Sequence, residues 1–169
     1  MAENIILIGF MGVGKGRTAR ALAAATGRYA IDTDNLIEIM VKKKIRKIFK
    51  KNGEPCFRAL EQQTADWLEQ HVTGTIVSTG GGFFMVNNIN RLGTVVYLHS
   101  SVKGILTAMQ NHPKAKRKIK KRPLLKDLDT ARTLFNERLP KYRQVADYEI
   151  NIKGREIADV VKEIAELVK

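Results

Sequence analysis

The residues best suited to chemistry form a glycine-rich stretch near the N-terminus, GFMGVGKGRT at residues 9–18. Its GxxxxGK pattern lets backbone amides surround an anionic phosphate at a helix N-terminus, while Lys15 reaches the outer phosphates. Gly16 replaces the serine or threonine whose hydroxyl usually holds Mg²⁺. Thr18 does not substitute for it, because two residues along a helix rotate the side chain by about 200°. The stretch predicts a phosphate-binding loop with weakened metal and nucleotide binding, and loss of activity is an open alternative.

Two further motifs follow predicted strands. The sequence DTD places Asp32 and Asp34 on one side of the chain if the strand continues through it, because side chains alternate along a strand. One carboxylate then faces the water shell of a metal and the other faces a substrate hydroxyl. Such a pair also caps helices, but beside a phosphate loop we interpret it as part of a site. TGGG at 79–82 adds a glycine turn after another β-branched segment.

Alternating strands and helices must position these motifs. Apolar segments predict five strands: ENIILIGF, residues 29–31, TIVS, TVVYL and YEINI. Helices are predicted from Lys15 to Gly27, from LIEIMV, over FRALEQQTADWLEQHV, and at about 101–111, 127–145 and 155–168. This order predicts one domain over 1–169, an α/β fold of three layers (α/β/α) with a five-stranded parallel sheet and ligands at the carboxyl ends of its strands. The three motifs then meet at one edge of the sheet.

The composition fits one soluble domain. A chain of 169 residues with 44% hydrophobic residues is long enough for a single buried core. No apolar run approaches the roughly 18 residues of a membrane span, and the N-terminus lacks the basic start of a signal peptide. Cys56 is the single cysteine, so an internal disulfide is excluded. These features predict a cytoplasmic protein without a membrane partner.

The formal charge of +13 is concentrated in two runs, at 42–51 and 114–122, with seven basic residues each. The first run is predicted to be the solvated face of a helix, because apolar residues recur in it at helical spacing. The second follows His112 and Pro113 and is predicted to be a mobile lid over a polyphosphate, at about 112–126. Nucleic-acid binding is a weaker hypothesis, because Phe49 is the only aromatic residue among the lysines of these two runs, and binding of single strands usually relies on aromatic side chains that stack on bases.

GFMGVGK, DTD, FRALE, TGGG, RPLL and ERLPKYRQVA, in this order over nearly the whole chain, resemble the shikimate kinase family. This family belongs to the nucleoside-monophosphate-kinase group of the P-loop NTPase fold. The resemblance implies a monomeric, Mg²⁺-dependent enzyme that transfers the γ-phosphoryl group of ATP to the 3-hydroxyl of shikimate, on the route to chorismate and the aromatic amino acids. The alternative is a weakened or inactive relative that binds or senses shikimate, because Gly16 lacks the hydroxyl.

The resemblance also implies residue roles. Shikimate contacts are implied for Asp34, Arg58, Gly80, Gly81, Gly82 and Arg138, with Glu61 positioning Arg58. ATP contacts are predicted for Gly12, Val13, Gly14, Lys15, Gly16, Arg17, Arg122 and Arg155. Catalytic roles are implied for Lys15, Asp34 and Arg122, and Asp32 and Ser78 are implied to order the waters of Mg²⁺. Physical chemistry agrees on the acceptor side, since the planar arginine fork matches a carboxylate in two hydrogen bonds.

Departures from the family pattern lie on the nucleotide side. Ala108 stands where the family has an arginine that packs on adenine, and Arg17 stands where a small residue is usual. NIKGRE at 151–156 is the predicted adenine loop, with Lys153 and Arg155 as candidate contacts. The lid lysines are hypothesised to compensate by long-range attraction to ATP, which salt would screen.

The remaining candidates have ordinary predicted roles. Cys56 is predicted to be a small core residue, and Trp67 to be core or partly covered. Tyr142 packs either under the shikimate site or in an ordinary helix contact. Surface or packing roles are predicted for His71, His99 and His112.

Overall fold

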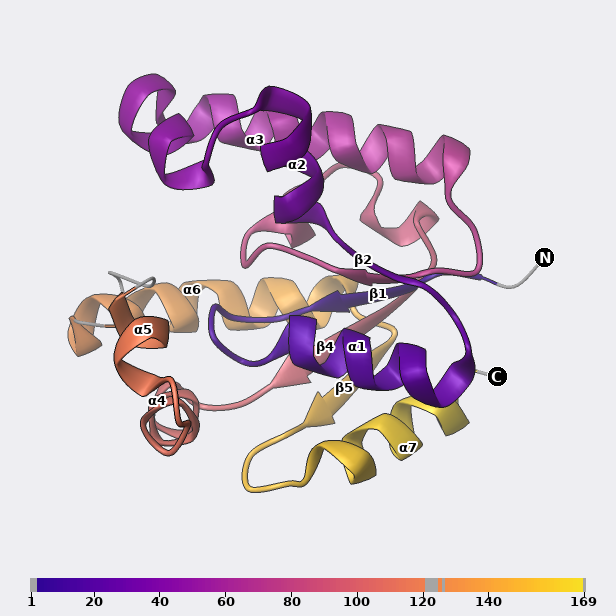
Figure 1. Cartoon of the computed structure of the whole chain (residues 1–169), viewed down its shortest axis with the longest axis vertical. Helices are drawn as coiled ribbons and strands as arrows, with labels where there is room; N and C mark the ends of the chain where they lie inside the picture. The colour runs from indigo at the N-terminus through magenta and orange to yellow at the C-terminus, as the bar shows by residue number, and fades with distance from the viewer. Residues whose placement is uncertain (1–2, 121–124, 126, 169) are drawn as a thin grey trace.

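The structure is a computed structural model that describes residues 3–120, Leu125 and residues 127–168. Within these residues, five parallel strands form one sheet in the order β2-β3-β1-β4-β5 (Figure 1). The strands are β1 Ile5–Ile8, β2 Ala30–Asp32, β3 Ile76–Ser78, β4 Thr94–His99 and β5 Tyr148–Asn151. Every residue of β1 is buried, as a continuous apolar run in a parallel sheet requires. The predicted fold class is confirmed.

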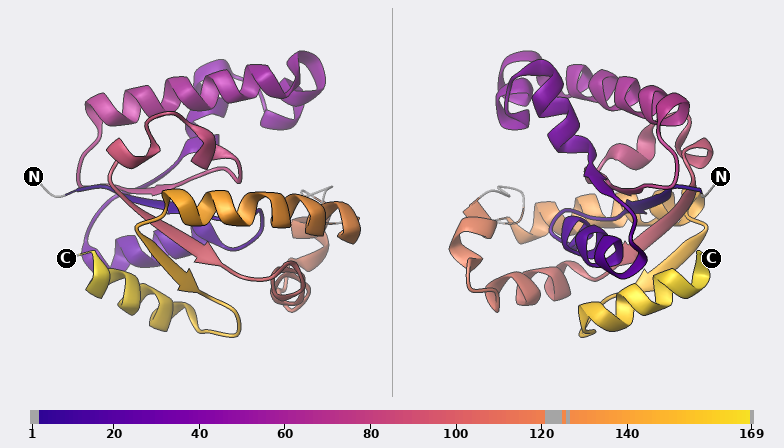
Figure 2. Two further views of the ribbon diagram at one scale, coloured as in Figure 1. Left: turned by 180° about the vertical axis from the view of Figure 1, so that it is seen from behind. Right: turned by 45° about the vertical axis from the view of Figure 1, so that its right-hand side comes forward.

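Helices cover both faces of the sheet (Figures 1 and 2). The helices α1 Lys15–Thr26 and α7 Ile157–Leu167 pack together on one face, and α6 Leu128–Val145 lies on the other with the short helix η1 Phe83–Met85. The short helix η2 Ile89–Arg91 follows η1, while α4 Val102–Gln110 and α5 Ala115–Lys120 lie beyond the end of β4. The layers place the carboxyl ends of β1, β2 and β3 beside one another.

The helices α2 Thr33–Val41 and α3 Ile45–His71 pack on each other at the β2 edge of the sheet. A small cluster of Ile37, Ile48 and Phe57 joins them, and half-buried Cys56 packs against it. The core role predicted for Cys56 is therefore confirmed in part. Trp67 is 45% exposed, which agrees with a partly covered position.

A kink divides α3 at Gly53, whose φ of 79° lies in the region that favours glycine. Pro55 follows two residues later and fits the first turn of the second helical segment, where its missing N–H leaves no helical bond unmade. Glu54, Arg58 and Glu61 consequently lie on one face of that segment, at i−4, i and i+3.

Two local predictions are corrected. The strand does not continue through DTD, because Asp32 caps α2 and its Oδ1 accepts a hydrogen bond of 3.1 Å from the Asn35 amide. Asp34 therefore lies in the first helical turn instead of alternating with Asp32 along a strand. In the predicted lid, residues 115–120 form the helix α5, which was not among the predicted helices. The first basic run matches its prediction from Ile45 onward, where α3 begins with Ile48 buried.

Candidate active site

The three motifs meet at the carboxyl edge of the sheet. Ser78 at the end of β3 lies opposite Asp32 of β2 on one side and Leu7 of β1 on the other. The phosphate loop follows β1, α2 follows β2, and the glycine turn follows β3. The convergence predicted from strand order therefore holds in the structure.

The phosphate loop uses glycine where the chain approaches a neighbouring strand. Gly9 has φ 149°, and a Cβ there would lie 2.7 Å from the carbonyl oxygen of Leu98 at the end of β4. Lys15 is buried, and its Nζ donates to the carbonyl oxygens of Gly9 at 2.6 Å and Phe10 at 3.1 Å. The ammonium group thus lies within the loop, where phosphate oxygens would compete with these carbonyls for it.

Gly16 is the second residue of α1, and the space beside it accepts a side chain. A Cβ there would lie 3.5 Å from Nη1 of Arg20 and 3.7 Å from Oγ of Ser78, which are ordinary contacts. Buried Ser78 has a hydroxyl oxygen near this point, and Asp32 lies opposite Ser78 on β2. Oxygen is the donor type that Mg²⁺ prefers. The described residues contain no group of three or more acidic, histidine or cysteine side chains that could hold a metal. The site fits an ion that keeps most of its waters.

The glycine turn after β3 is enclosed by three charged side chains. A Cβ at Gly80 would lie 2.8 Å from Oδ1 of Asp34. A Cβ at Gly82 would overlap the Arg58 guanidinium, with Nη2 at 2.6 Å. Arg138 from α6 donates its Nη1 to the Gly81 carbonyl oxygen at 3.1 Å. The structure therefore brings together all the residues predicted to hold the acceptor.

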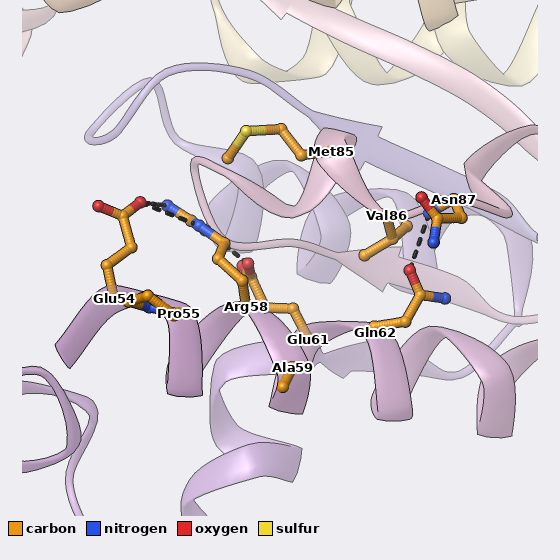
Figure 3. A pocket seen from close by; sticks show the side chains of 9 residues that line it. All are labelled: Glu54, Pro55, Arg58, Ala59, Glu61, Gln62, Met85, Val86 and Asn87. Atoms are coloured by element: carbon orange, nitrogen blue, oxygen red, sulfur yellow. Dashed lines mark hydrogen bonds and ion pairs between the residues drawn. The ribbon is translucent and has the colours of Figure 1, made fainter. Parts of the chain in front are cut away.

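Arg58 is held by two glutamates of its own helix (Figure 3). Its Nη1 donates to Oε2 of Glu61 at 2.5 Å, and its Nε and Nη2 donate to Oε1 of Glu54 at 3.0 and 2.7 Å. The Glu61 side chain is 1% exposed, and burial raises its pKa while Arg58 opposes the rise. The predicted Glu61–Arg58 contact is present, whereas Glu54 was not among the predicted residues.

Asp34 is half-buried, and its carboxyl group, with a buried Oδ1, lies near other acids. Burial raises its pKa to about 6, with further upward contributions from Asp32 and Glu61 and a downward one from Lys15. Within the described residues, Oδ1 of Asp34 and Oε1 of Glu61 are buried without a hydrogen-bond partner. Both atoms lie within 3.2 Å of the position of a Cβ at Gly80, so they face the same small region and suit a ligand that donates hydroxyl protons.

Tyr142 lies under the glycine turn, one helical turn beyond Arg138 on α6. Its hydroxyl donates to the Gly81 carbonyl oxygen at 2.5 Å, and its ring stacks on Tyr97 at 5.0 Å between centroids. Burial raises the pKa of Tyr142 to about 12. Both predicted descriptions therefore apply, since Tyr142 is a packed helix residue and also contacts the turn. Arg138 and Tyr142 are four residues apart on one helix, and this spacing places both side chains on the same face. The sequence could therefore have indicated that they contact the same segment.

The predicted nucleotide contacts are spread over several segments. Arg155 donates its Nη1 to Oε2 of Glu163 at 2.5 Å and to the Asn151 carbonyl oxygen at 3.2 Å. Arg17 and Ala108 are exposed on α1 and α4. Arg122 lies outside the described residues, so its predicted role rests on the sequence.

The phosphate loop also contacts α4, which the sequence did not reveal. A Cβ at Gly12 would lie 3.0 Å from Sδ of Met109 and 3.1 Å from Cγ2 of Ile105. The histidines have the ordinary places predicted: His71 is exposed, His112 is half-buried, and Nδ1 of His99 lies 2.9 Å from the Tyr97 hydroxyl.

A phosphate loop between a parallel strand and a helix, facing an arginine-lined acceptor site, defines a P-loop kinase with a small anionic acceptor. The family model for shikimate kinase matches residues 11–169. The chain therefore belongs to the shikimate kinase family, whose members are ATP-dependent phosphotransferases.

Individual relatives agree with this assignment. A shikimate kinase of Helicobacter hepaticus is 40% identical over 149 residues, covering 88% of this chain and 86% of the relative. One from a Sulfurihydrogenibium species is 36% identical over 172 residues, covering 99% and 98%. The structure of an Acinetobacter baumannii shikimate kinase in complex with shikimate superposes with a TM-score of 0.84 at 31% identity, covering 99% of this chain and 93% of that one. These relatives give no support to the alternative of an inactive binding protein. No helix among the described residues has the length and apolar character to cross a bilayer.

Proposed function

We propose that this chain transfers the γ-phosphoryl group of ATP to the 3-hydroxyl of shikimate and forms shikimate 3-phosphate. The supporting observation is the enclosure of one glycine turn by Asp34, Arg58 and Arg138, beside a phosphate loop. Two guanidinium groups and one half-buried carboxyl group match a small molecule that carries one carboxylate and several hydroxyls. The A. baumannii relative was solved in complex with shikimate.

The acceptor would be held by charge at one end and by hydrogen bonds at the other. Arg58 and Arg138 bind the shikimate carboxylate, and the turn at Gly80 to Gly82 leaves room because no Cβ projects from it. Asp34 accepts a hydrogen bond from a ring hydroxyl through Oδ1, which has no partner among the described residues. Fixed placement of the hydroxyl against the phosphorus atom accounts for much of the rate, because phosphoryl transfer depends on in-line geometry.

Asp34 would take the proton of the attacking hydroxyl. Its pKa of about 6 lies near neutral pH, where a general base combines a large ionised fraction with useful basicity. The new bond joins the 3-oxygen of shikimate to the γ-phosphorus, the bond from that phosphorus to the bridging oxygen of ADP breaks, and the hydroxyl proton passes to Asp34.

The donor side would bind the polyphosphate through backbone amides and Lys15. Phosphate oxygens displace the Gly9 and Phe10 carbonyls from the ammonium group and take their place as acceptors. Asp32 and Ser78 would hold Mg²⁺ through its waters, and Gly16 adds no ligand. When bound, Mg²⁺ neutralises charge on the phosphate oxygens. Contacts to ATP from Gly12, Val13, Gly14, Arg17, Arg122 and Arg155 remain part of this proposal.

We further propose a single-domain, monomeric and cytoplasmic enzyme. The five strands and their covering helices share one main core cluster, which spans from β1 to α7. Sedimentation of the purified chain at micromolar concentration tests the monomer, since a second copy would double the mass.

The direct test measures ADP release with ATP, Mg²⁺ and shikimate, together with detection of shikimate 3-phosphate by phosphorus NMR. The expected result is turnover that requires all three. Arg138→Met should raise the shikimate KM at least about tenfold, because a lost charged hydrogen bond costs about 1.5–3 kcal/mol, while the ATP KM stays within twofold. Arg91→Met removes a surface arginine that pairs with Glu69 and serves as the matched control. Absence of shikimate-dependent ADP release would refute the proposal.

A further inference from the structure

The Arg58 guanidinium has unequal partners on its edges. Nη1 donates to Glu61, while Nε and Nη2 both donate to the single oxygen Oε1 of Glu54. Gly82 lies against the Nη1 and Nη2 end of the group, where no Cβ could be accommodated. The edge formed by Nε and Nη2 is one of the two that can hold a carboxylate through parallel hydrogen bonds, and in this structure a carboxylate of the protein already lies on it.

The two glutamates differ in how firmly they are held. The Glu61 side chain is 1% exposed, whereas that of Glu54 is 57% exposed. An exposed ion pair adds little net stability, because water solvates both charges once they separate. Breaking the buried Glu61 contact would leave a charge without compensation inside the protein. An arriving anion can therefore displace Glu54 and leave Glu61 in place.

The surroundings of Glu54 give it room to leave. Glu54, Pro55 and Arg58 line a cavity of about 570 Å³ that extends to Met85 and Asn87. Figure 3 shows the Glu54 carboxylate turned toward Arg58, and the Glu54 side chain is 57% exposed. Glu54 begins the segment after the kink at Gly53, so its side chain can move without disturbing the packed part of α3.

We propose that Glu54 is a displaceable stand-in for the substrate carboxylate: it holds the Nε and Nη2 edge of Arg58 until the acceptor carboxylate takes that edge. This inference rests on the proposed function. Glu54 is a positioning residue that keeps the guanidinium aimed along the glycine turn between turnovers. It also competes with the substrate, and since Glu61 and Gly82 hold Arg58 as well, competition is the larger effect.

The test is calorimetric titration of shikimate, without nucleotide, into the parent chain, Glu54→Gln and Glu69→Gln. Glu69 lies on the same helix and pairs with Arg91, so its variant matches the change of charge. Glu54→Gln should bind shikimate about fivefold tighter, the size of one exposed charge pair, and Glu69→Gln should stay within twofold of the parent. The shikimate methyl ester should gain no more than twofold in Glu54→Gln, because a neutral group cannot take over the charge.

Steady-state kinetics separate competition with the substrate from a purely structural role, because only competition lowers the KM for shikimate when Glu54 is changed. The KM for shikimate should fall about fivefold in Glu54→Gln with kcat unchanged or lower, since a tighter acceptor is not a better-aligned one. Equal or weaker shikimate binding by Glu54→Gln, or an equal gain for the ester, would overturn the role of Glu54 even if the parent phosphorylates shikimate. A parent that neither binds nor phosphorylates shikimate would refute the proposed function itself, and this inference with it.

Discussion

The acceptor site and the nucleotide site lie at the same edge of the sheet, but they differ in how closely protein atoms pack around them. We call them the acceptor side and the nucleotide side. On the acceptor side, side chains interlock with the glycine turn so closely that a Cβ at Gly80 or Gly82 would meet Asp34 or Arg58 within 2.8 Å. On the nucleotide side, the phosphate loop packs closely against β4 and α4 at Gly9 and Gly12, but a Cβ at Gly14, at the start of α1, would have no atom of the described residues within 4 Å. The acceptor pocket is therefore organised before substrate arrives, whereas the polyphosphate site is completed by its ligand.

The difference follows from what lies beneath each side. The acceptor turn is supported by the buried rings of Tyr142, Tyr97 and Phe84, with Tyr142 and Phe84 at 4.6 Å in an edge contact. The nucleotide side is built from the phosphate loop, which packs on the buried residues Met109 and Ile105 of α4 but has no neighbour at Gly14 within the part of the chain that the structure describes. Close packing transmits small changes, so substitutions under the acceptor turn should have larger effects than equal substitutions near ATP.

The largest expected effect is that of Asp34→Asn. Loss of a general base lowers kcat by about 10²–10⁴-fold. The same change should stabilise the fold at pH 7.5, because a pKa raised from 3.8 to about 6 means that the ionised form costs about 3 kcal/mol in the folded state. Turnover and the thermal unfolding midpoint measure the two effects. A variant that is both inactive and less stable would indicate structural damage instead of a lost base.

The variants Gly82→Ala, on the acceptor side, and Gly16→Ala, on the nucleotide side, compare the two sides directly. In Gly82→Ala the change lies beside Arg58. Its methyl group would displace the Arg58 guanidinium, so the shikimate KM should rise about 100-fold, equivalent to about 2.7 kcal/mol of lost binding. Gly16→Ala adds the same methyl group where the neighbouring atoms lie 3.5 Å or more away, and its shikimate KM should stay within twofold. Steady-state kinetics in both substrates measures the contrast. Similar losses in both variants would show that the acceptor side is no more rigid than the nucleotide side.

The pH dependence of kcat/KM and of stability tests the role of Asp34 on the acceptor side. Asp34 with a pKa of about 6 is protonated below that pH, so kcat/KM for shikimate should fall about tenfold per pH unit there. The stability contribution of this carboxyl group has the opposite sign. The folded state binds the proton more tightly than the unfolded state, so stability falls as the pH rises from about 4 to about 6. A kcat/KM that stays flat down to pH 5 would remove Asp34 from the role of base.

The order of strands and motifs along the chain was enough to predict which motifs meet at the carboxyl edge of the sheet. Because parallel strands align their carboxyl ends, the positions of Asp34, Gly81 and Ser78 beside the phosphate loop could be predicted from motifs that follow strands. Arg58 and Arg138 could not be placed from spacing alone, since a solitary arginine on a helix is usually solvated. The family resemblance supplied both, and the structure places both at the glycine turn.

The features that were missed depend on local competition and on distant contacts. Asp32 ends β2 because its carboxylate caps α2; the sequence offered this cap as an alternative to a continued strand but did not decide between the two. Glu54 pairs with Arg58 at i, i+4, but it lies before Phe57, where the predicted helix began. Tyr142 reaches a carbonyl 61 residues away in the sequence. Side-chain orientation and long-range packing decide these contacts, and neither is encoded in a short motif.

Tyr142→Phe tests the support beneath the turn. The Gly81 carbonyl would keep Arg138 as a donor and lose the Tyr142 hydroxyl, so the shikimate KM should rise about fivefold for a hydrogen bond worth about 1 kcal/mol. The ATP KM should stay within twofold, because the lost hydrogen bond is made to the acceptor turn. Tyr148→Phe is a control on the neighbouring strand β5, where the ring is half-buried. A larger rise in the ATP KM than in the shikimate KM would contradict the separation of the two sides.

The smallest expected effect is that of Gly16→Ser, which lies on the nucleotide side. The added Cβ fits, and its hydroxyl would lie near Oγ of Ser78, where it can become a further oxygen ligand for Mg²⁺ in place of a water. Because Mg²⁺ keeps several waters readily, one exchanged ligand should lower the Mg²⁺ concentration for half-maximal rate only about threefold, with the shikimate KM unchanged. Titration of Mg²⁺ at saturating shikimate measures this. If the parent were inactive and the serine restored turnover, the missing hydroxyl ligand would control catalysis, and water would not be an adequate substitute for it.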